Sequence, residues 1–219
     1  MQKEEKDSTI KKEKGYPFSF PHAERKVFQI AGGVKLPEKY GGMHDMAEEK
    51  KRYGEETRGK FDCPVELAQW LLGKTLCHKR PDGRVTCLVI TETEAYDHDD
   101  PACYGYGGKT TNNAPLFERG GTCCIYGEML LIACGKEGEP DNVLIRRAGN
   151  ETTYCPGPIL LCEELGLGKE QSGLDLLTSE ALWLEGTDEL RACCRTQRVG
   201  LSDTLDREYQ ELRYRFILL

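Results

Sequence analysis

The first regular pattern of apolar positions along the chain begins just after residue 61. In the segment VELAQWLLG the apolar side chains recur at the spacing of one helix face. Asp62 precedes it as a capping residue, Pro64 stands where a first helical turn accepts proline, and Gly73 is typical of a helix end. We therefore expect a helix over residues 64–72.

The next segments predict strands. Residues 75–78 and 84–96 flank a Pro-Asp-Gly turn at 81–83, which is the pattern of a β-hairpin. A second helix is expected to begin at Pro158 and to end at Gly166. Further strands are expected at residues 129–133, 143–146, 181–185, 198–201 and 213–218.

Residues 97–122 form a glycine-rich segment without a regular period. A connection of this length in a compact domain is often functional. The chain has no internal repeat and no alternation of strands with helices. The pattern therefore predicts the α+β class: a single domain at residues 60–219 with a mainly antiparallel, curved β-sheet and a few peripheral helices.

Residues 1–59 alternate blocks of charge with isolated aromatic residues and glycines. They contain 13 Lys and Arg against 11 Asp and Glu, a net charge of +2, whereas residues 60–219 contain 17 against 26, a net charge of −9. We expect residues 1–59 to be a charged, disordered extension. Its basic clusters are typical of a solvated charge run, and a localisation signal is the alternative.

Composition excludes two classes of protein. Hydrophobic residues make up 38% of the 219 residues and charged residues 31%. No run approaches the roughly 18 apolar residues of a membrane span, and the first residues lack the apolar core of a signal peptide. We therefore expect neither a membrane protein nor a secreted one. The net charge of −7 means that nucleic-acid binding must depend on a local basic region.

The 11 cysteines are expected to be reduced, because their number is odd and no signal peptide precedes them. No Cys-x-x-Cys pair is present, and the four histidines follow no ligand spacing. Buried small hydrophobic residues are therefore favoured over the alternative, zinc ligands. We expect no metal and no cofactor.

The strand at residues 84–96 contains the most informative polar residues. Because alternate side chains of a strand share a face, Glu92, Glu94 and Tyr96 are expected on one side. Leu88 and Ile90 precede them at the same alternation. Two carboxylates and an aromatic ring beside a long loop predict the edge of a pocket, and a solvated strand face is the alternative.

Two other features are candidates for binding. Arg146 ends the apolar run 143–145, so its guanidinium is expected to emerge from a sheet, where it pairs with a carboxylate or contacts a phosphate. Four tyrosines lie in or near the glycine-rich segment, namely Tyr96, Tyr104, Tyr106 and Tyr126. Clustered aromatic residues of this kind suit stacking on a nucleobase, and core packing is the alternative.

Nine segments between residues 65 and 218 follow one another in a fixed order. They are LAQWLLGKTL, ITETEAY, GGKT at 107–110, residues 117–122, EGEPDNVLIRRA, GPILLCEELGL, LWLEG, RVGLS and LRYRFIL. In this order and near this spacing they resemble the alkyladenine (3-methyladenine, or N-methylpurine) DNA glycosylase family.

The resemblance implies a monofunctional DNA glycosylase of base excision repair. Such an enzyme hydrolyses the N-glycosidic bond of a purine flipped out of double-stranded DNA and leaves an abasic site. The implied substrates are alkylated or deaminated purines of the 3-methyladenine, 7-methylguanine and hypoxanthine class. We expect a monomer that acts in the nucleus, or in the cytoplasm of a prokaryote.

The resemblance also implies roles for individual residues. Glu94 is the catalytic carboxylate that activates water, Tyr96 is a stacking face for the base, and Arg146 orients the site. Tyr104 stands where family members commonly have a histidine that hydrogen-bonds the flipped nucleotide, and Tyr126 is a second aromatic wall. No lysine within ITETEAY is available for a Schiff base, so no lyase step is expected.

The chain departs from the family at residues 121–131, a segment that is about three residues shorter here. Met129 is the candidate for the wedge that fills the gap left by a flipped nucleotide, and Leu131 falls near the position of an asparagine. Glu128 carries a charge that a phosphate backbone repels. These departures favour an alternative function, a catalytically impaired relative that binds nucleic acid or a protein.

Overall fold

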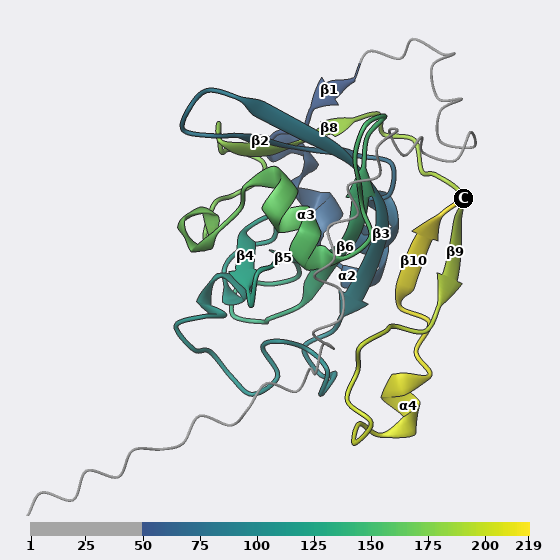
Figure 1. The fold of residues 1–219 in the computed structure, drawn as a ribbon. Helices are drawn as coiled ribbons and strands as arrows, with labels where there is room; N and C mark the ends of the chain where they lie inside the picture. The colour runs from purple at the N-terminus through teal and green to yellow at the C-terminus, as the bar shows by residue number, and fades with distance from the viewer. Residues whose placement is uncertain (1–49) are drawn as a thin grey trace, which may run out of the picture.

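The longest strand, β3 (Val85–Tyr96), pairs with three neighbours and organises the sheet (Figure 1). Its first half pairs with β2 (Thr75–Lys79) in the expected hairpin. Its second half lies between β6 (Asn142–Gly149) and β10 (Arg215–Leu218). The computed structural model describes residues 50–219, so residues 1–49 of the extension expected at 1–59 lie outside the described part.

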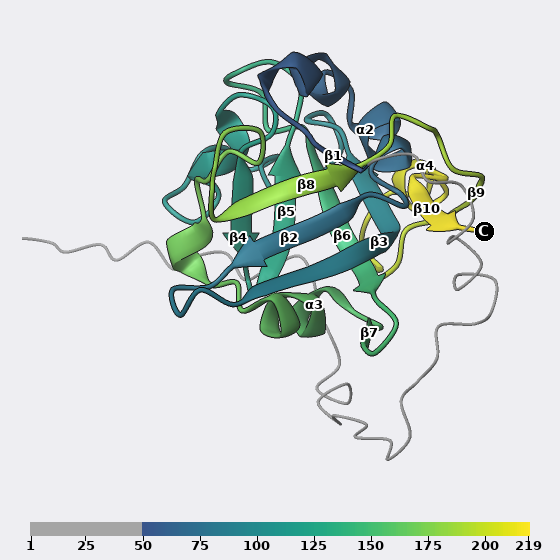
Figure 2. The same cartoon turned by 90° about the horizontal axis from the view of Figure 1, so that it is seen from above.

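All the strand pairs are antiparallel, and the main path through the sheet runs β1-β8-β2-β3-β6-β5-β4. The other strands are β1 (Lys51–Arg52), β4 (Cys123–Tyr126), β5 (Met129–Ala133), β7 (Tyr154–Cys155), β8 (Leu182–Gly186) and β9 (Cys193–Thr196). Seen from above, β8 and β2 cross in front of β5 and β4, so the sheet curls over on itself (Figure 2). A curled antiparallel sheet with a few helices confirms the predicted α+β class.

Short helices surround the sheet. They are α2 (Pro64–Trp70), α3 (Pro158–Leu165), α4 (Arg207–Gln210) and three 3-10 helices at Glu55–Phe61, Ala114–Phe117 and Lys169–Gln171. Both predicted longer helices begin at their proline, and α3 ends at Gly166, whose φ of 71° is the left-handed conformation that favours glycine. The residue that caps α2 is Cys63 and not the expected Asp62. No helix within residues 50–219 is both long and apolar enough to cross a bilayer.

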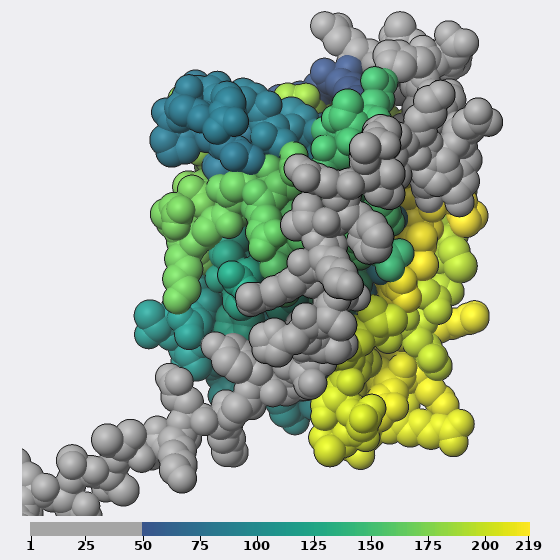
Figure 3. Space-filling view, viewed as in Figure 1, coloured from purple at the N-terminus to yellow at the C-terminus, as the bar shows by residue number. Residues whose placement is uncertain are grey.

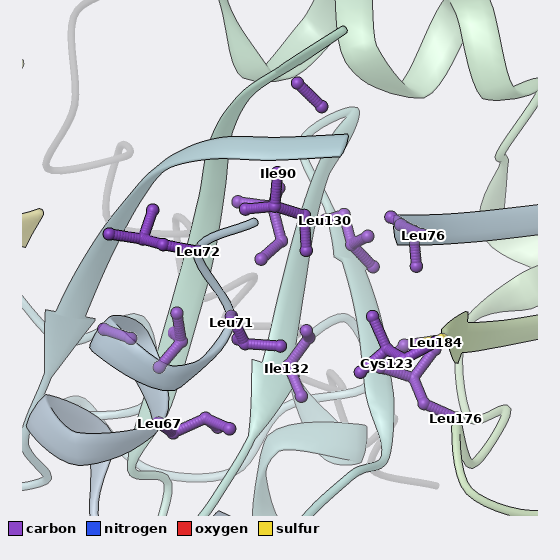
Figure 4. Packing of buried hydrophobic residues seen from close by; sticks show 14 of the residues in the cluster. Leu67, Leu71, Leu72, Leu76, Ile90, Cys123, Leu130, Ile132, Leu176 and Leu184 are labelled. Atoms are coloured by element: carbon purple, nitrogen blue, oxygen red, sulfur yellow. The ribbon is translucent and has the colours of Figure 1, made fainter. Parts of the chain in front are cut away.

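The main core lies inside the curl of the sheet. Leu76 and Leu184 from β2 and β8 pack in one cluster with Leu130 and Ile132 from β5 (Figure 4). Leucines of α2 and the turn that follows it, among them Leu67, belong to the same cluster. Each of these side chains is fully buried, and burial of one such side chain stabilises a fold by roughly 1.5–3 kcal/mol.

The folded domain begins before residue 60, the boundary expected from the sequence. Strand β1 pairs with β8, and Tyr53 is only 1% exposed, with its ring centroid 4.8 Å from that of Trp70. Tyr53 binds this charged segment to the core together with the pairing of β1 and β8. It produces no period along the sequence, so the pattern of apolar positions does not reveal it.

Two expectations about local structure are wrong. Residues 198–201 form no strand; the strand is β9, at Cys193–Thr196, and the chain turns after it through Gly200, whose φ is 76°. Cys77 and Cys87 are not reduced but form a disulfide, because the β2–β3 hairpin places them directly opposite each other, with a Cα–Cα distance of 4.2 Å. The other nine cysteines are free thiols.

Candidate active site

A bulge in β3 separates its apolar half from its polar half. The register with β6 shifts between Ile90 and Glu92 and again between Glu92 and Thr93. Leu88 and Ile90 belong to the main core, whereas Glu94 lies on the other face of the sheet. Glu92, Glu94 and Tyr96 lie on one face, as expected, because Arg146 contacts both carboxylates and the Tyr96 hydroxyl donates to Glu94. The expectation is wrong for Leu88 and Ile90, because one extra residue in a strand reverses the alternation.

Glu94 is completely buried, which excludes the alternative of a solvated strand face. Its Oε2 accepts a hydrogen bond from the Tyr96 hydroxyl at 2.7 Å and lies 3.5 Å from Nη1 of Arg146. Its Oε1 accepts from the Val199 N–H at 2.9 Å. Burial raises the pKa of the Glu94 carboxyl above its usual value, although Arg146, the Val199 N–H and the Tyr96 hydroxyl act in the opposite direction. Such a carboxylate accepts a proton more readily than an ordinary one.

Glu92 is also completely buried, but arginines surround it. Nε of Arg215 donates to Oε1 at 2.6 Å, and Nε of Arg146 donates to the same oxygen at 3.2 Å. Nη1 of Arg147 lies 3.0 Å from Oε2, an ionic contact. Burial opposes the charge on Arg146, but Glu94 and Glu92 outweigh it and raise the pKa of this guanidinium. Arg146 therefore stays charged and bridges the two carboxylates.

Three tyrosines from three elements form a row beside Glu94. The ring centroids of Tyr96 and Tyr104 are 5.5 Å apart at an interplanar angle of 73°, and those of Tyr104 and Tyr126 are 5.3 Å apart at 68°. Both contacts are edge to face. Tyr96 is 1% exposed and Tyr104 8%. The fold thus brings together five of the residues singled out from the sequence, namely Glu94, Tyr96, Tyr104, Tyr126 and Arg146.

Met129, the expected wedge, is packed beside this row. It is only 4% exposed and belongs to the same apolar cluster as Tyr126. The two residues are directly paired across β4 and β5, so their side chains share a face. Gly127 and Glu128 form the exposed turn between them. A residue that enters a duplex has to project from the surface, and in this conformation Met129 does not.

The roles assigned from the sequence include no residue of the segment 197–211, which lies beside Glu94. Val199 donates its N–H to Glu94, and the side chain of Arg198 is completely buried next to it. The wrong prediction of a strand at 198–201 hid both contacts. The segment RVGLS was the one signal in the sequence that pointed to this region.

Among the described residues, His98, Glu139 and Asp141 come nearest to a metal site, with one ligand atom of each within 4.8 Å of the others. Oδ1 of Asp141 already accepts from the backbone N–H of His98 at 2.5 Å and contacts its Nδ1 at 2.9 Å. The hydrogen bond to Asp141 raises the pKa of His98 above its usual value. A protonated imidazole does not bind a metal ion, so this arrangement favours an ion pair.

Two cavities flank the tyrosine row. One of about 510 Å³ is an open hollow lined by residues of the segment 197–211, including Arg198 and Leu205. The other, of about 440 Å³, is lined by Tyr126 and the turn at Gly127. Glu94 lines neither. In the space-filling view, the yellow C-terminal residues and the teal residues of the loops and of β4 form the lower part of the molecule (Figure 3).

Comparison with known proteins decides the family. A family profile described as methylpurine-DNA glycosylase matches residues 60–219. The chain belongs to the methylpurine-DNA glycosylase family. The resemblance stated from the sequence is therefore confirmed, and the chain is a monofunctional DNA glycosylase whose substrate is DNA.

Individual relatives agree with this assignment. A Rubrobacter xylanophilus protein is 34% identical over 169 residues, which cover 68% of this chain and 85% of that protein. A Chlorobium luteolum protein is 33% identical over 165 residues, 65% and 84% of the two chains. An Encephalitozoon cuniculi protein is 31% identical over 173 residues, 68% and 83%. All three carry the assigned name of a 3-methyladenine DNA glycosylase.

Proposed function

We propose that this methylpurine-DNA glycosylase excises alkylated purines of the 3-methyladenine and 7-methylguanine class, and deaminated purines such as hypoxanthine, from double-stranded DNA. Water adds to C1′ of the deoxyribose and an abasic site remains. The observation that supports the proposal is the surroundings of Glu94, a buried carboxylate of raised pKa that is adjacent to a row of tyrosine rings.

In the proposed reaction, Glu94 acts on the sugar and on the water. Cleavage of the bond between C1′ and the base passes through an oxocarbenium-like state, which a nearby carboxylate stabilises. The oxygen of the attacking water bonds to C1′, and Glu94 takes the proton that this water loses. The Tyr96 hydroxyl and the Val199 N–H hold the two carboxylate oxygens in place, and Arg146 keeps the carboxylate ionised.

The base leaves with the electron pair of the broken bond. An alkylated purine such as 3-methyladenine is already a cation, so this pair neutralises it and no proton is needed. Hypoxanthine is neutral, so it leaves with the electron pair and takes up one proton from the solvent. A cationic base over an aromatic face gains about 1–2 kcal/mol, so the Tyr96 ring favours alkylated purines.

Tyr104 occupies the space that a base beside Tyr96 requires. Rings in face-to-face contact lie about 3.5 Å apart, so a base between two rings needs roughly 7 Å from one ring to the other. The centroids of Tyr96 and Tyr104 are only 5.5 Å apart. In the proposed mechanism the Tyr104 ring therefore moves when a base is inserted, and its hydroxyl then contacts the flipped nucleotide.

A second candidate function is a binding module that recognises DNA without cleaving it. Two observations favour it: the burial of Met129 and the net charge of −9 on residues 60–219. Both predict weak binding to a duplex, because a wedge and phosphate-binding cations supply much of the affinity of such proteins.

Base release from defined duplexes tests the two functions. Duplexes with a single 7-methylguanine or a single hypoxanthine are incubated with excess protein, and alkali-labile strand breaks are counted. We expect breaks at both lesions, none in an undamaged duplex, and a rate of break formation at least about 10²-fold lower with Glu94→Gln. Binding without breaks in the wild-type protein contradicts the proposal and supports the binding module. Breaks at 7-methylguanine alone restrict the substrates to alkylated purines.

A further inference from the structure

Arg198 lies between β9 and α4, and its side chain is completely buried. Nη1 donates to the carbonyl oxygen of Ala95 at the end of β3, at 3.1 Å. Nη2 donates to the carbonyl oxygen of Tyr209 in α4, also at 3.1 Å, and lies 2.5 Å from Oδ2 of Asp100. Asp100 is 2% exposed and belongs to the loop that follows β3. One guanidinium thus joins β3, this loop and α4.

The same guanidinium contacts the first tyrosine of the row. Its Cζ lies 4.6 Å from the centroid of the Tyr96 ring, within the range of a cation–π interaction. The hydroxyl of that ring donates to Glu94, and Tyr104 packs edge to face with the ring. Arg198 therefore limits the movement of the ring on which a base is proposed to stack.

The next residue in the chain completes the connection. Val199 donates its N–H to Oε1 of Glu94 at 2.9 Å. Because a single peptide unit joins Arg198 to this N–H, the position of the donor depends on where the guanidinium is held. Gly200 follows with a φ of 76°, so the chain turns away directly afterwards.

We propose that Arg198 is a positioning residue for base excision, which holds the Val199 N–H on Glu94 and the Tyr96 ring in place through its buried ion pair with Asp100. Arg198 acts through these groups and touches no reacting atom. The proposal rests on the proposed function, in which Glu94 activates water. An apolar pair of similar volume stabilises a fold about as well as a buried ion pair does. The directed hydrogen bonds of Arg198 therefore indicate that it fixes the positions of the groups around it, in addition to any contribution to stability.

The pH dependence of excision reports on this geometry. The charged and titratable groups that face Glu94 are Arg146 from β6, Tyr96 and Glu92 from β3, and Tyr104 from the loop. If the Val199 N–H leaves the carboxylate, the ionised form of Glu94 loses a donor and its pKa rises. The acidic limb of the rate profile then moves to higher pH.

The test compares variants of the full chain in single-turnover excision of 7-methylguanine, at saturating protein and over a range of pH. We expect Arg198→Gln to lower the maximal rate about 100-fold, the effect of a misplaced catalytic group, with unchanged affinity for the duplex. Its acidic limb should lie at higher pH. Arg198→Lys should recover part of the rate, because it keeps the charge beside Asp100. Asp100→Asn should fall between wild type and Arg198→Gln.

Arg84→Gln is the matched control, since it breaks an exposed Arg–Asp pair, with Asp82, in the β2–β3 turn. It should leave the rate and the pH profile unchanged. If Arg198→Gln lowers only the melting temperature, with the wild-type rate per folded molecule and the wild-type profile, the proposal is wrong. If Arg198→Gln does not fold, wild-type rates and profiles for both Arg198→Lys and Asp100→Asn overturn it. Excision by Glu94→Gln at the wild-type rate instead overturns the proposed function.

Discussion

Two buried carboxylates stand two residues apart on β3, in surroundings that differ completely. The region around Glu92 is an arginine cluster, in which three guanidiniums contact one carboxylate. The region around Glu94 is the tyrosine row, in which the carboxylate has a hydroxyl, a backbone N–H and one guanidinium at 3.5 Å. Both side chains are 0% exposed, so burial does not distinguish them.

The difference lies in how well each charge is compensated. The charge of Glu92 is matched by cations from β6 and β10, and these contacts hold three strands together. The charge of Glu94 has weaker partners, and its pKa is raised. A buried carboxylate whose charge is fully compensated by cations thus serves the structure. One whose charge is only partly compensated is available for proton transfer.

Glu94→Gln is expected to have the largest effect on activity. Excision should fall by about 10²–10⁴-fold, the usual contribution of a general base. The free energy of unfolding should stay the same or increase, because an amide is buried more easily than a carboxylate. Single-turnover excision and urea unfolding of the same preparation check both parts. A variant that keeps excision within a factor of two of wild type contradicts the role of Glu94.

Glu92→Gln should reverse this pattern. It leaves three arginines without their shared counter-ion, so we expect a loss of about 3–5 kcal/mol in the free energy of unfolding, or roughly 6–20 °C in Tm. Excision per folded molecule should fall less than in Glu94→Gln. Glu163→Gln, at an exposed position of α3, is the control and should change stability by less than about 0.5 kcal/mol. Equal stability of Glu92→Gln and this control contradicts the comparison.

The raised pKa of Glu94 makes both stability and excision depend on pH. The pKa of Glu94 in the folded protein is higher than in the unfolded chain, so its contribution to stability is complete below the unfolded value and is lost as pH rises through the folded value. Excision should follow the opposite course and increase over the same range. Unfolding of wild type and Glu94→Gln at several pH values measures the difference. The stability of Glu94→Gln relative to wild type should increase with pH, and a constant difference excludes a raised pKa.

Tyr96→Phe should have the smallest effect. It keeps the ring but removes the hydroxyl that donates to Glu94, so the pKa of the carboxyl should rise further. We expect a loss of roughly tenfold in excision at the acidic end of the profile and little change at its alkaline end. A uniform loss at all pH values points instead to a role of the hydroxyl in binding the base.

The sequence predicted the site residues that local pattern can reveal. The alternation in ITETEAY and the end of an apolar run identified Glu94, Tyr96 and Arg146 as candidates, because strand faces follow from neighbouring residues. The contact between Glu94 and Val199 joins residues 105 positions apart, and nothing local marks it.

The bulge in β3 and the start of the folded domain before residue 60 could not be predicted from the sequence for a similar reason. The extra residue near Glu92 is fixed by pairing with β6, and Tyr53 is fixed by its contact with Trp70. Each depends on a partner that the local sequence does not specify. The sheet, the two longer helices and the β2–β3 hairpin were predictable, since each has its own turn or capping residues.

In the described structure, the edge-to-face contact of Tyr96 and Tyr104 leaves no room for a base between the two rings. On the proposed mechanism, the Tyr104 ring must move before any flipped base can be inserted, and the free energy of this movement is the same for every nucleotide. A closed resting state lowers the apparent affinity for all bases by one common factor. Because this factor is the same for every base, selectivity on the proposed mechanism depends on the lower cost of extruding a damaged base and on its positive charge over the Tyr96 ring. On this mechanism, bases are therefore discriminated before the glycosidic bond is attacked.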